Sequence, residues 1–124
     1  MKKRIVVIDD DQTILDIAGE FLRNAGYQVD TSDCTISSNS LIYTEPEPDL
    51  LILDVMMPLM SGDYKLKKLK SREDSRNIPV LLISAKPEAE LKELAEEAGA
   101  DGFLAKPLSE RALLQAVRLL LRND

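Results

Sequence analysis

Three short, continuous apolar blocks constrain the fold of this chain most strongly. They occupy residues 5–8, 50–53 and 80–83 and consist of isoleucine, valine and leucine alone. Runs of this length and composition are typical of strands that are buried on both faces of a parallel sheet. A segment with helical character follows each block, so the chain alternates between strand and helix. This alternation predicts an α/β fold with helices on both faces of the sheet.

The predicted helices are recognised by apolar spacing and by the residues at their ends. Apolar residues recur at helical spacing in four segments: residues 14–25, 66–69, 91–98 and 113–121. Residues of the usual capping types stand at the expected ends: Gly26, Pro87, Gly99 and Ser109. Glycine commonly follows a helix, and proline or serine commonly begins one. Four regular helices are therefore predicted.

Two weaker strands and one irregular segment complete the pattern. Residues 27–31 alternate between apolar and polar types, as expected of a half-exposed edge strand. Residues 102–105 form a short strand before Lys106. Residues 32–48 are rich in serine and threonine and end in Pro46 and Pro48, so a second helix there should be short or irregular. The prediction is a doubly wound sheet of five strands with five helices.

Length and composition narrow the functional classes. The 124 residues are enough for one domain with its own core, so we expect a single domain over residues 1–124. The net charge of −6 disfavours direct binding to nucleic acid or anionic lipid. Cys34 is the one cysteine and histidine is absent, which excludes an internal disulfide and argues against zinc. No signal peptide or membrane span is evident, and we expect a cytoplasmic location.

Side chains that could bind a ligand or take part in a reaction follow four of the predicted strands. The carboxyl ends of parallel strands are where open α/β sheets bind their ligands. The residues at these ends are Asp9, Asp10, Asp11, Asp54, Ser84 and Lys106. Each alone is typical of a helix cap or a surface charge, and for Asp11 the cap at the start of the first helix is the favoured interpretation. Their joint occurrence indicates a site.

The residue types at this edge indicate phosphoryl chemistry. Clustered carboxylates repel one another and need a cation to stay ionised. Oxygen ligands select a hard cation, so Mg²⁺ or Mn²⁺ is expected. Phosphoryl transfer depends on neutralising charge and on positioning, and an aspartate can act as its nucleophile. Ser84 would donate a hydrogen bond to a phosphoryl oxygen, and Lys106 would pair with another.

At these residues the sequence resembles the receiver domain of bacterial two-component response regulators. The resemblance runs from Lys3 to about Arg122 and rests on five stretches: residues 5–11, 48–58, 61–62, 78–85 and 99–107. It implies a flavodoxin-like parallel sheet in the order 2-1-3-4-5. It also implies a signalling switch rather than a conventional enzyme, with phosphorylation and dephosphorylation at its own aspartate.

The resemblance implies a role for each residue of the site. Asp54 corresponds to the phosphoacceptor, and Asp9 and Asp10 to the acidic pair that holds the metal, with Asp10 the more direct ligand. Met56 would offer the metal its backbone carbonyl. Phe103 matches the aromatic residue that turns inward as Ser84 moves towards the phosphoryl group, although it fits a plain core aromatic equally well. The bond between Lys106 and Pro107 is expected to be cis.

The resemblance also implies partners. A histidine kinase or a histidine phosphotransfer domain would supply the phosphoryl group, and phosphorylation would change the face formed by the fourth helix, fifth strand and fifth helix. The implied oligomeric state is a monomer or a weak, phosphorylation-dependent dimer. Ile14 and Leu15, next to the acidic cluster, are candidates for contact with the partner's helix, although both also fit core positions.

Two other interpretations remain open at this point. The spacing Asp9-x-Asp11-x-Thr13 also matches phosphatases of the haloacid dehalogenase type. The chain is short for that fold and offers only Glu110 shortly after Lys106, where those enzymes need an acidic pair. A pseudo-receiver that binds partners without phosphorylation is the second alternative, and the complete residue set argues against it.

Overall fold

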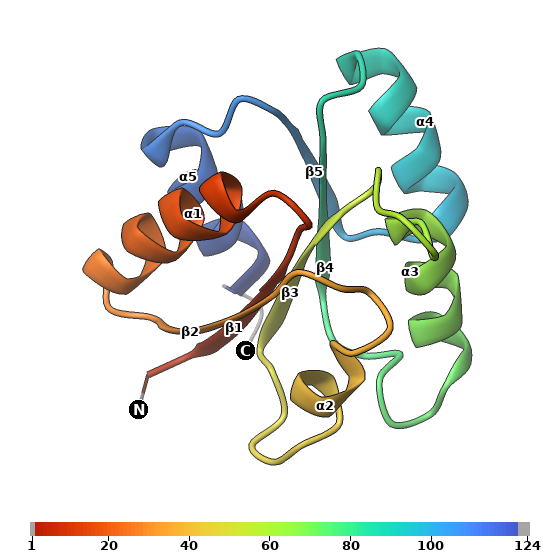
Figure 1. Ribbon diagram of the computed structural model, residues 1–124, viewed down its shortest axis with the longest axis horizontal. Coiled ribbons are helices and arrows are strands. Elements are labelled where there is room, and N and C mark those ends of the chain that lie inside the picture. Colours follow the sequence, from red (N-terminus) through yellow and green to blue (C-terminus); the bar gives the residue numbers. More distant parts are fainter. Residues whose placement is uncertain (1, 122–124) are drawn as a thin grey trace.

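The computed structural model describes residues 2–121 as a three-layer α/β domain (Figure 1). Met1 and residues 122–124, which fall within the predicted domain and include Arg122 at the end of the resemblance, lie outside the described residues. The strands are β1 (Arg4–Ile8), β2 (Gln28–Ser32), β3 (Leu50–Asp54), β4 (Val80–Ser84) and β5 (Gly102–Ala105). All pair in parallel in the order β2-β1-β3-β4-β5, which confirms the predicted topology.

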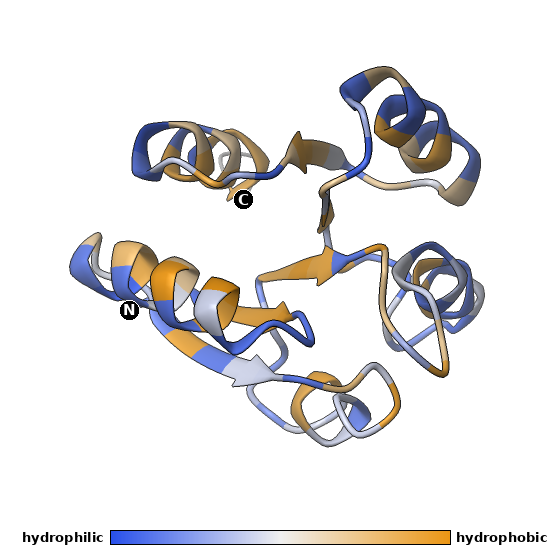
Figure 2. Ribbon diagram, turned by 45° about the horizontal axis from the view of Figure 1, so that its top comes forward, coloured by the Kyte–Doolittle hydropathy of each residue, from blue (hydrophilic) through white to orange (hydrophobic). Residues whose placement is uncertain are grey.

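The helices divide between the two faces of the sheet (Figure 1). They are α1 (Gln12–Asn24), α2 (Asn39–Ile42), α3 (Gly62–Ser71), α4 (Glu88–Ala98) and α5 (Glu110–Leu121). The side chains of α1 and α5 pack in one apolar cluster, and those of α2, α3 and α4 pack in the other. Figure 2 shows the apolar central strands between these helical layers.

The apolar blocks form the core because each is enclosed from both sides. Every residue of β1, β3 and β4 is buried, whereas β2 and β5 lie at the edges and are mostly half-buried. Neighbouring residues of β1 point to opposite helical layers, so Val6 packs with α3 and α4 while Val7 packs with α1 and α5. The predictions for both edge strands are confirmed.

The capping predictions are also confirmed. Gly26 and Gly99 have positive φ values of 99° and 82° after α1 and α4, a conformation that glycine adopts without steric penalty. The Ser109 hydroxyl accepts a hydrogen bond from the Ala112 amide at 3.1 Å, as an N-cap should. Helix α2 is a single turn preceded by turns over residues 35–38, so the second helix is indeed short.

The core face of α1 differs from the predicted one. The buried residues are Leu15, Ala18, Gly19 and Leu22, which share a face by their spacing of three and four. Ile17, which belongs to the apolar pattern predicted over residues 14–25, is 36% exposed, whereas Leu15 is 3% exposed. Leu15 is therefore a core residue and not a surface for a partner helix; Ile14 is half-buried against the same cluster. Within residues 2–121, no helix is long and apolar enough to cross a membrane.

Candidate functional site

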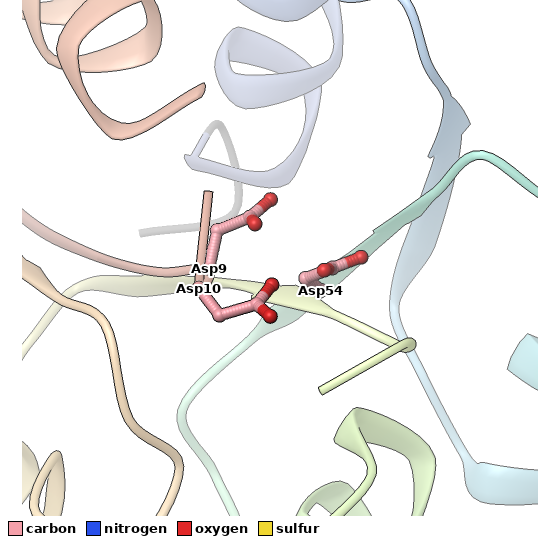
Figure 3. A group of neighbouring side chains, drawn as sticks. All are labelled: Asp9, Asp10 and Asp54. Atoms are coloured by element: carbon pink, nitrogen blue, oxygen red, sulfur yellow. The ribbon is translucent and has the colours of Figure 1, made fainter. Parts of the chain in front are cut away.

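Three aspartates from two neighbouring strands converge at the carboxyl edge of the sheet (Figure 3). Asp9 and Asp10 directly follow β1, and Asp54 is the last residue of β3. The parallel register pairs Ile8 with Leu53, so both strands deliver their carboxylates to the same level. One oxygen of each carboxylate lies within 4.8 Å of the others. The sequence prediction that these residues meet is confirmed.

The three carboxylates differ in exposure. Asp9 is fully buried and Asp54 is 2% exposed, whereas Asp10 is open to solvent. One Asp9 oxygen accepts a hydrogen bond from the Asp11 amide at 2.9 Å, which fixes the turn into α1. The cluster therefore has a fixed inner side and an open side at Asp10, from which a solvated ion or a substrate can enter.

Lys106 supplies the positive charge of the cluster. Its Nζ lies 2.8 Å from Asp9 Oδ2 and 3.5 Å from Asp54 Oδ1. It follows β5, and its amide donates to the Ser84 carbonyl at 2.8 Å, which ties the end of β5 to the end of β4. The bond to Pro107 is cis, as the resemblance implied. Burial disfavours the Lys106 ammonium, but the two carboxylates outweigh it and its pKa is raised.

The Asp54 carboxyl group has a raised pKa. Burial and the neighbouring Asp9 carboxylate raise its pKa to about 6, and Lys106 only partly opposes them. Asp54 is therefore ionised near neutral pH but carries its charge at a free-energy cost. A cation bound beside it would remove that cost.

The donor set fits a hard divalent cation. Asp9 Oδ2 and Asp54 Oδ1 are buried without a well-directed hydrogen bond, although Lys106 attracts both. In octahedral Mg²⁺ sites with metal–oxygen distances of about 2.1 Å, ligand oxygens lie about 3 to 4.2 Å apart. The three carboxylate oxygens lie within 4.8 Å of one another, a limit slightly wider than this range. All three ligands are carboxylate oxygens, which Mg²⁺ and Mn²⁺ prefer.

The remaining predicted residues lie on the strands of the sheet or just after their carboxyl ends. Asp11 caps α1 through a 2.9 Å hydrogen bond from the Thr13 amide, so its predicted structural role is confirmed. Ser84 is fully buried at the end of β4, and its hydroxyl oxygen accepts from the Lys86 amide at 3.1 Å. Phe103 is half-buried against the cluster packed by α3 and α4. Met56 is 56% exposed, two residues beyond Asp54.

Gly62 also shapes the site, a role that was not predicted from the sequence. It begins α3, and its amide donates to the Val55 carbonyl at 2.9 Å. A Cβ at this position would overlap the backbone carbonyl of Asp54. Only glycine allows α3 to approach the end of β3 this closely. Its place eight residues after Asp54 was visible in the sequence, but the contact depends on the packed structure.

Comparison with known proteins places the chain among receiver domains. A family model described as the response regulator receiver domain matches residues 5–118. The chain is 35% identical over 124 residues to the phosphate regulon transcriptional regulatory protein PhoB of Escherichia coli. The match covers 99% of this chain and 53% of that protein. The chain is also 36% identical to the alkaline phosphatase synthesis transcriptional regulatory protein PhoP of Bacillus subtilis, covering 50% of it. The chain thus spans about half the length of these relatives.

Solved structures give the same result. The chemotaxis protein CheY4 of Vibrio cholerae superposes with a TM-score of 0.89 at 26% identity, covering 98% of this chain and 100% of that one. The receiver domain of a signal transduction histidine kinase from Syntrophus aciditrophicus superposes with a TM-score of 0.85 at 31% identity, covering 97% and 90%. Neither the family nor these structures support the phosphatase interpretation.

Proposed function

Because this chain belongs to the response regulator receiver domain family, we propose that it is a switch that accepts a phosphoryl group on Asp54. The observation that carries the proposal is the nearly buried Asp54 carboxylate, held beside Asp9, Asp10 and Lys106 at the open edge of the sheet. We assign residues 1–124 to a single receiver domain, which is supported by the family match over residues 5–118.

Asp54 is the nucleophile of the proposed reaction. A carboxylate oxygen attacks the phosphorus of a partner's phosphohistidine, the P–N bond breaks, and the imidazole leaves with the electron pair and takes up a proton. The product is an acyl phosphate on Asp54. With its pKa at about 6, Asp54 is mainly ionised at neutral pH and can attack. Hydrolysis of the acyl phosphate by water releases inorganic phosphate and returns the Asp54 carboxylate.

The neighbouring residues neutralise the charge that this reaction places on the phosphoryl group. Asp9, Asp10, Asp54 and the Met56 carbonyl would hold Mg²⁺ or Mn²⁺. This cation would supply positive charge in addition to that of Lys106. Lys106 already lies 3.5 Å from Asp54 Oδ1 and would pair with a phosphoryl oxygen. Stabilising the transferred charge is the main requirement of phosphoryl transfer.

Ser84 and Phe103 carry the signal away from the site in this proposal. The Ser84 hydroxyl oxygen accepts from Lys86, and its proton is the donor for a phosphoryl oxygen. Movement of Ser84 towards the phosphoryl group makes room for half-buried Phe103 to turn inward. The face formed by α4, β5 and α5 then changes. To shift the populations of two conformations from 1:99 to 99:1, the phosphoryl group must stabilise one conformation over the other by about 5.5 kcal/mol.

A histidine kinase or histidine phosphotransfer domain is the proposed donor, and the proposed output is contact between the changed face and another protein or a second phosphorylated copy. The net charge of −6 argues against direct contact with DNA. A cytoplasmic setting is proposed with these partners.

Phosphorylation by acetyl phosphate tests the proposal without a cognate kinase. With Mg²⁺, intact-protein mass spectrometry should detect one added phosphoryl group, and the adduct should be absent from Asp54→Asn and from chelator-treated protein. Asp16→Asn is the matched control, because Asp16 is an exposed aspartate of α1. An adduct of equal yield on Asp54→Asn would refute the assignment. Normal phosphorylation without a divalent cation would refute the metal's role.

A further inference from the structure

A groove of about 680 Å³ lies between the loop after β3 and helix α4. Figure 1 shows α3 and α4 side by side on one face of the sheet, and their residues contact one another. The apolar part of the groove is formed by Val55, Met57 and Leu94, with Met56 exposed at its edge. Buried and half-buried apolar residues thus border an open surface depression.

The polar part of the groove is strongly acidic. Its described lining includes four carboxylates, those of Asp63, Glu90, Glu93 and Glu97, and one ammonium, that of Lys86. These five residues carry a net charge of −3, which is half of the net charge of the whole chain. Three of the carboxylates lie on one face of α4, because their positions differ by three, four and seven residues.

We propose that this groove binds a basic amphipathic helix of a partner protein. Such a helix would place apolar side chains against Met57 and Leu94 and lysine or arginine side chains beside the carboxylates of α4. The unbranched methionine side chains adapt to ligands of different shape. A second copy would bring its own acidic α4 to the same surface, and like charges disfavour that pairing.

This surface shares α4 with the face proposed to change on phosphorylation, but it uses a different side of that helix. The groove lies on the α3 side of α4, whereas α4 also contacts β5, and α5 lies across the sheet with α1 (Figure 1). Binding in the groove requires neither phosphorylation nor a metal. A test with the metal-free, unphosphorylated chain therefore fails or succeeds independently of the role proposed for Asp54.

The probe is a helix-forming peptide of about 18 residues with leucines on one face and lysines on the other. Titration of the full chain, followed by amide and methionine methyl NMR shifts, should give saturable changes at Met56, Met57 and Leu94. The double variant Glu93→Gln/Glu97→Gln should weaken binding about fivefold, since exposed ion pairs contribute modestly. Its matched control is Glu88→Gln/Glu96→Gln, which removes the same charge from exposed positions of α4 outside the groove.

Any of four results would overturn the proposal. One is the absence of saturable shifts. Another is a set of shifts confined to β5 and α5. The third is equal weakening by the control variant, which would show attraction to net charge alone. An acidic peptide with the same leucine face should not bind, and its binding at equal affinity would also contradict the proposal.

Discussion

Replacing Asp54 with asparagine should stabilise the metal-free protein. Burial and the Asp9 carboxylate raise the pKa of Asp54 from 3.8 to about 6, so the folded state holds this proton more tightly than the unfolded state. The resulting stability is present at low pH and is lost as the pH rises from 3.8 to 6. A shift of about two units corresponds to about 3 kcal/mol. Because Asp10 is exposed, solvent reaches this side of the cluster and screens the Asp54 charge. We therefore expect the variant to gain about 1–3 kcal/mol in its free energy of unfolding.

Urea unfolding in a chelating buffer measures this effect directly. At pH 7.5 the Asp54→Asn variant should unfold at higher urea than the wild type, and the difference should shrink as the pH is lowered from 6 towards 4. Added Mg²⁺ should stabilise the wild type more than the variant, because it binds the folded site. Asp16→Asn, on the exposed face of α1, should change the stability by less than about 0.5 kcal/mol. A variant no more stable than the wild type at pH 7.5 would refute the reasoning.

Three further changes test other parts of the site. Gly62→Ala should destabilise the fold by about 1–3 kcal/mol and slow phosphorylation, because its Cβ would displace the Asp54 carbonyl. Gly19→Ala is the control, because the atoms nearest to the new Cβ belong to the flexible Arg23 side chain. Lys106→Met should cost about 1–3 kcal/mol in urea unfolding, which Mg²⁺ partly restores. Calorimetric Mg²⁺ affinity should fall up to about tenfold per pH unit below 6, because protons compete for Asp54.

The framework of the fold was predictable because it depends on local patterns. Buried central strands require unbroken apolar blocks, and helix ends require particular residues, so β1, β3, β4 and the caps at Gly99 and Ser109 followed from the sequence. The convergence of Asp9, Asp10 and Asp54 followed as well, since parallel strands end at one edge.

Features that depend on packing between elements were not predictable. The core face of α1 contains Leu15 but not Ile17. Apolar residues three and four positions apart occur on more than one face of this helix, so the buried face was determined only by the packing of the helix on the sheet. Lysine side chains are usually exposed, yet Lys65 is 4% exposed and donates a hydrogen bond to Asn39 of α2. Lys106 lies closer to Asp9 than to Asp54, and this difference likewise depends on how the strands and loops pack.

Reductive trapping of the phosphorylated protein identifies the phosphoacceptor most directly. Borohydride converts an acyl phosphate to an alcohol, so the modified aspartate is recognised by peptide mass spectrometry after reaction with acetyl phosphate and Mg²⁺. We predict that the modification occurs at residue 54, in the peptide that contains the end of β3. Modification at Asp9 or Asp10, with residue 54 unchanged, would contradict the assignment of Asp54 as the nucleophile.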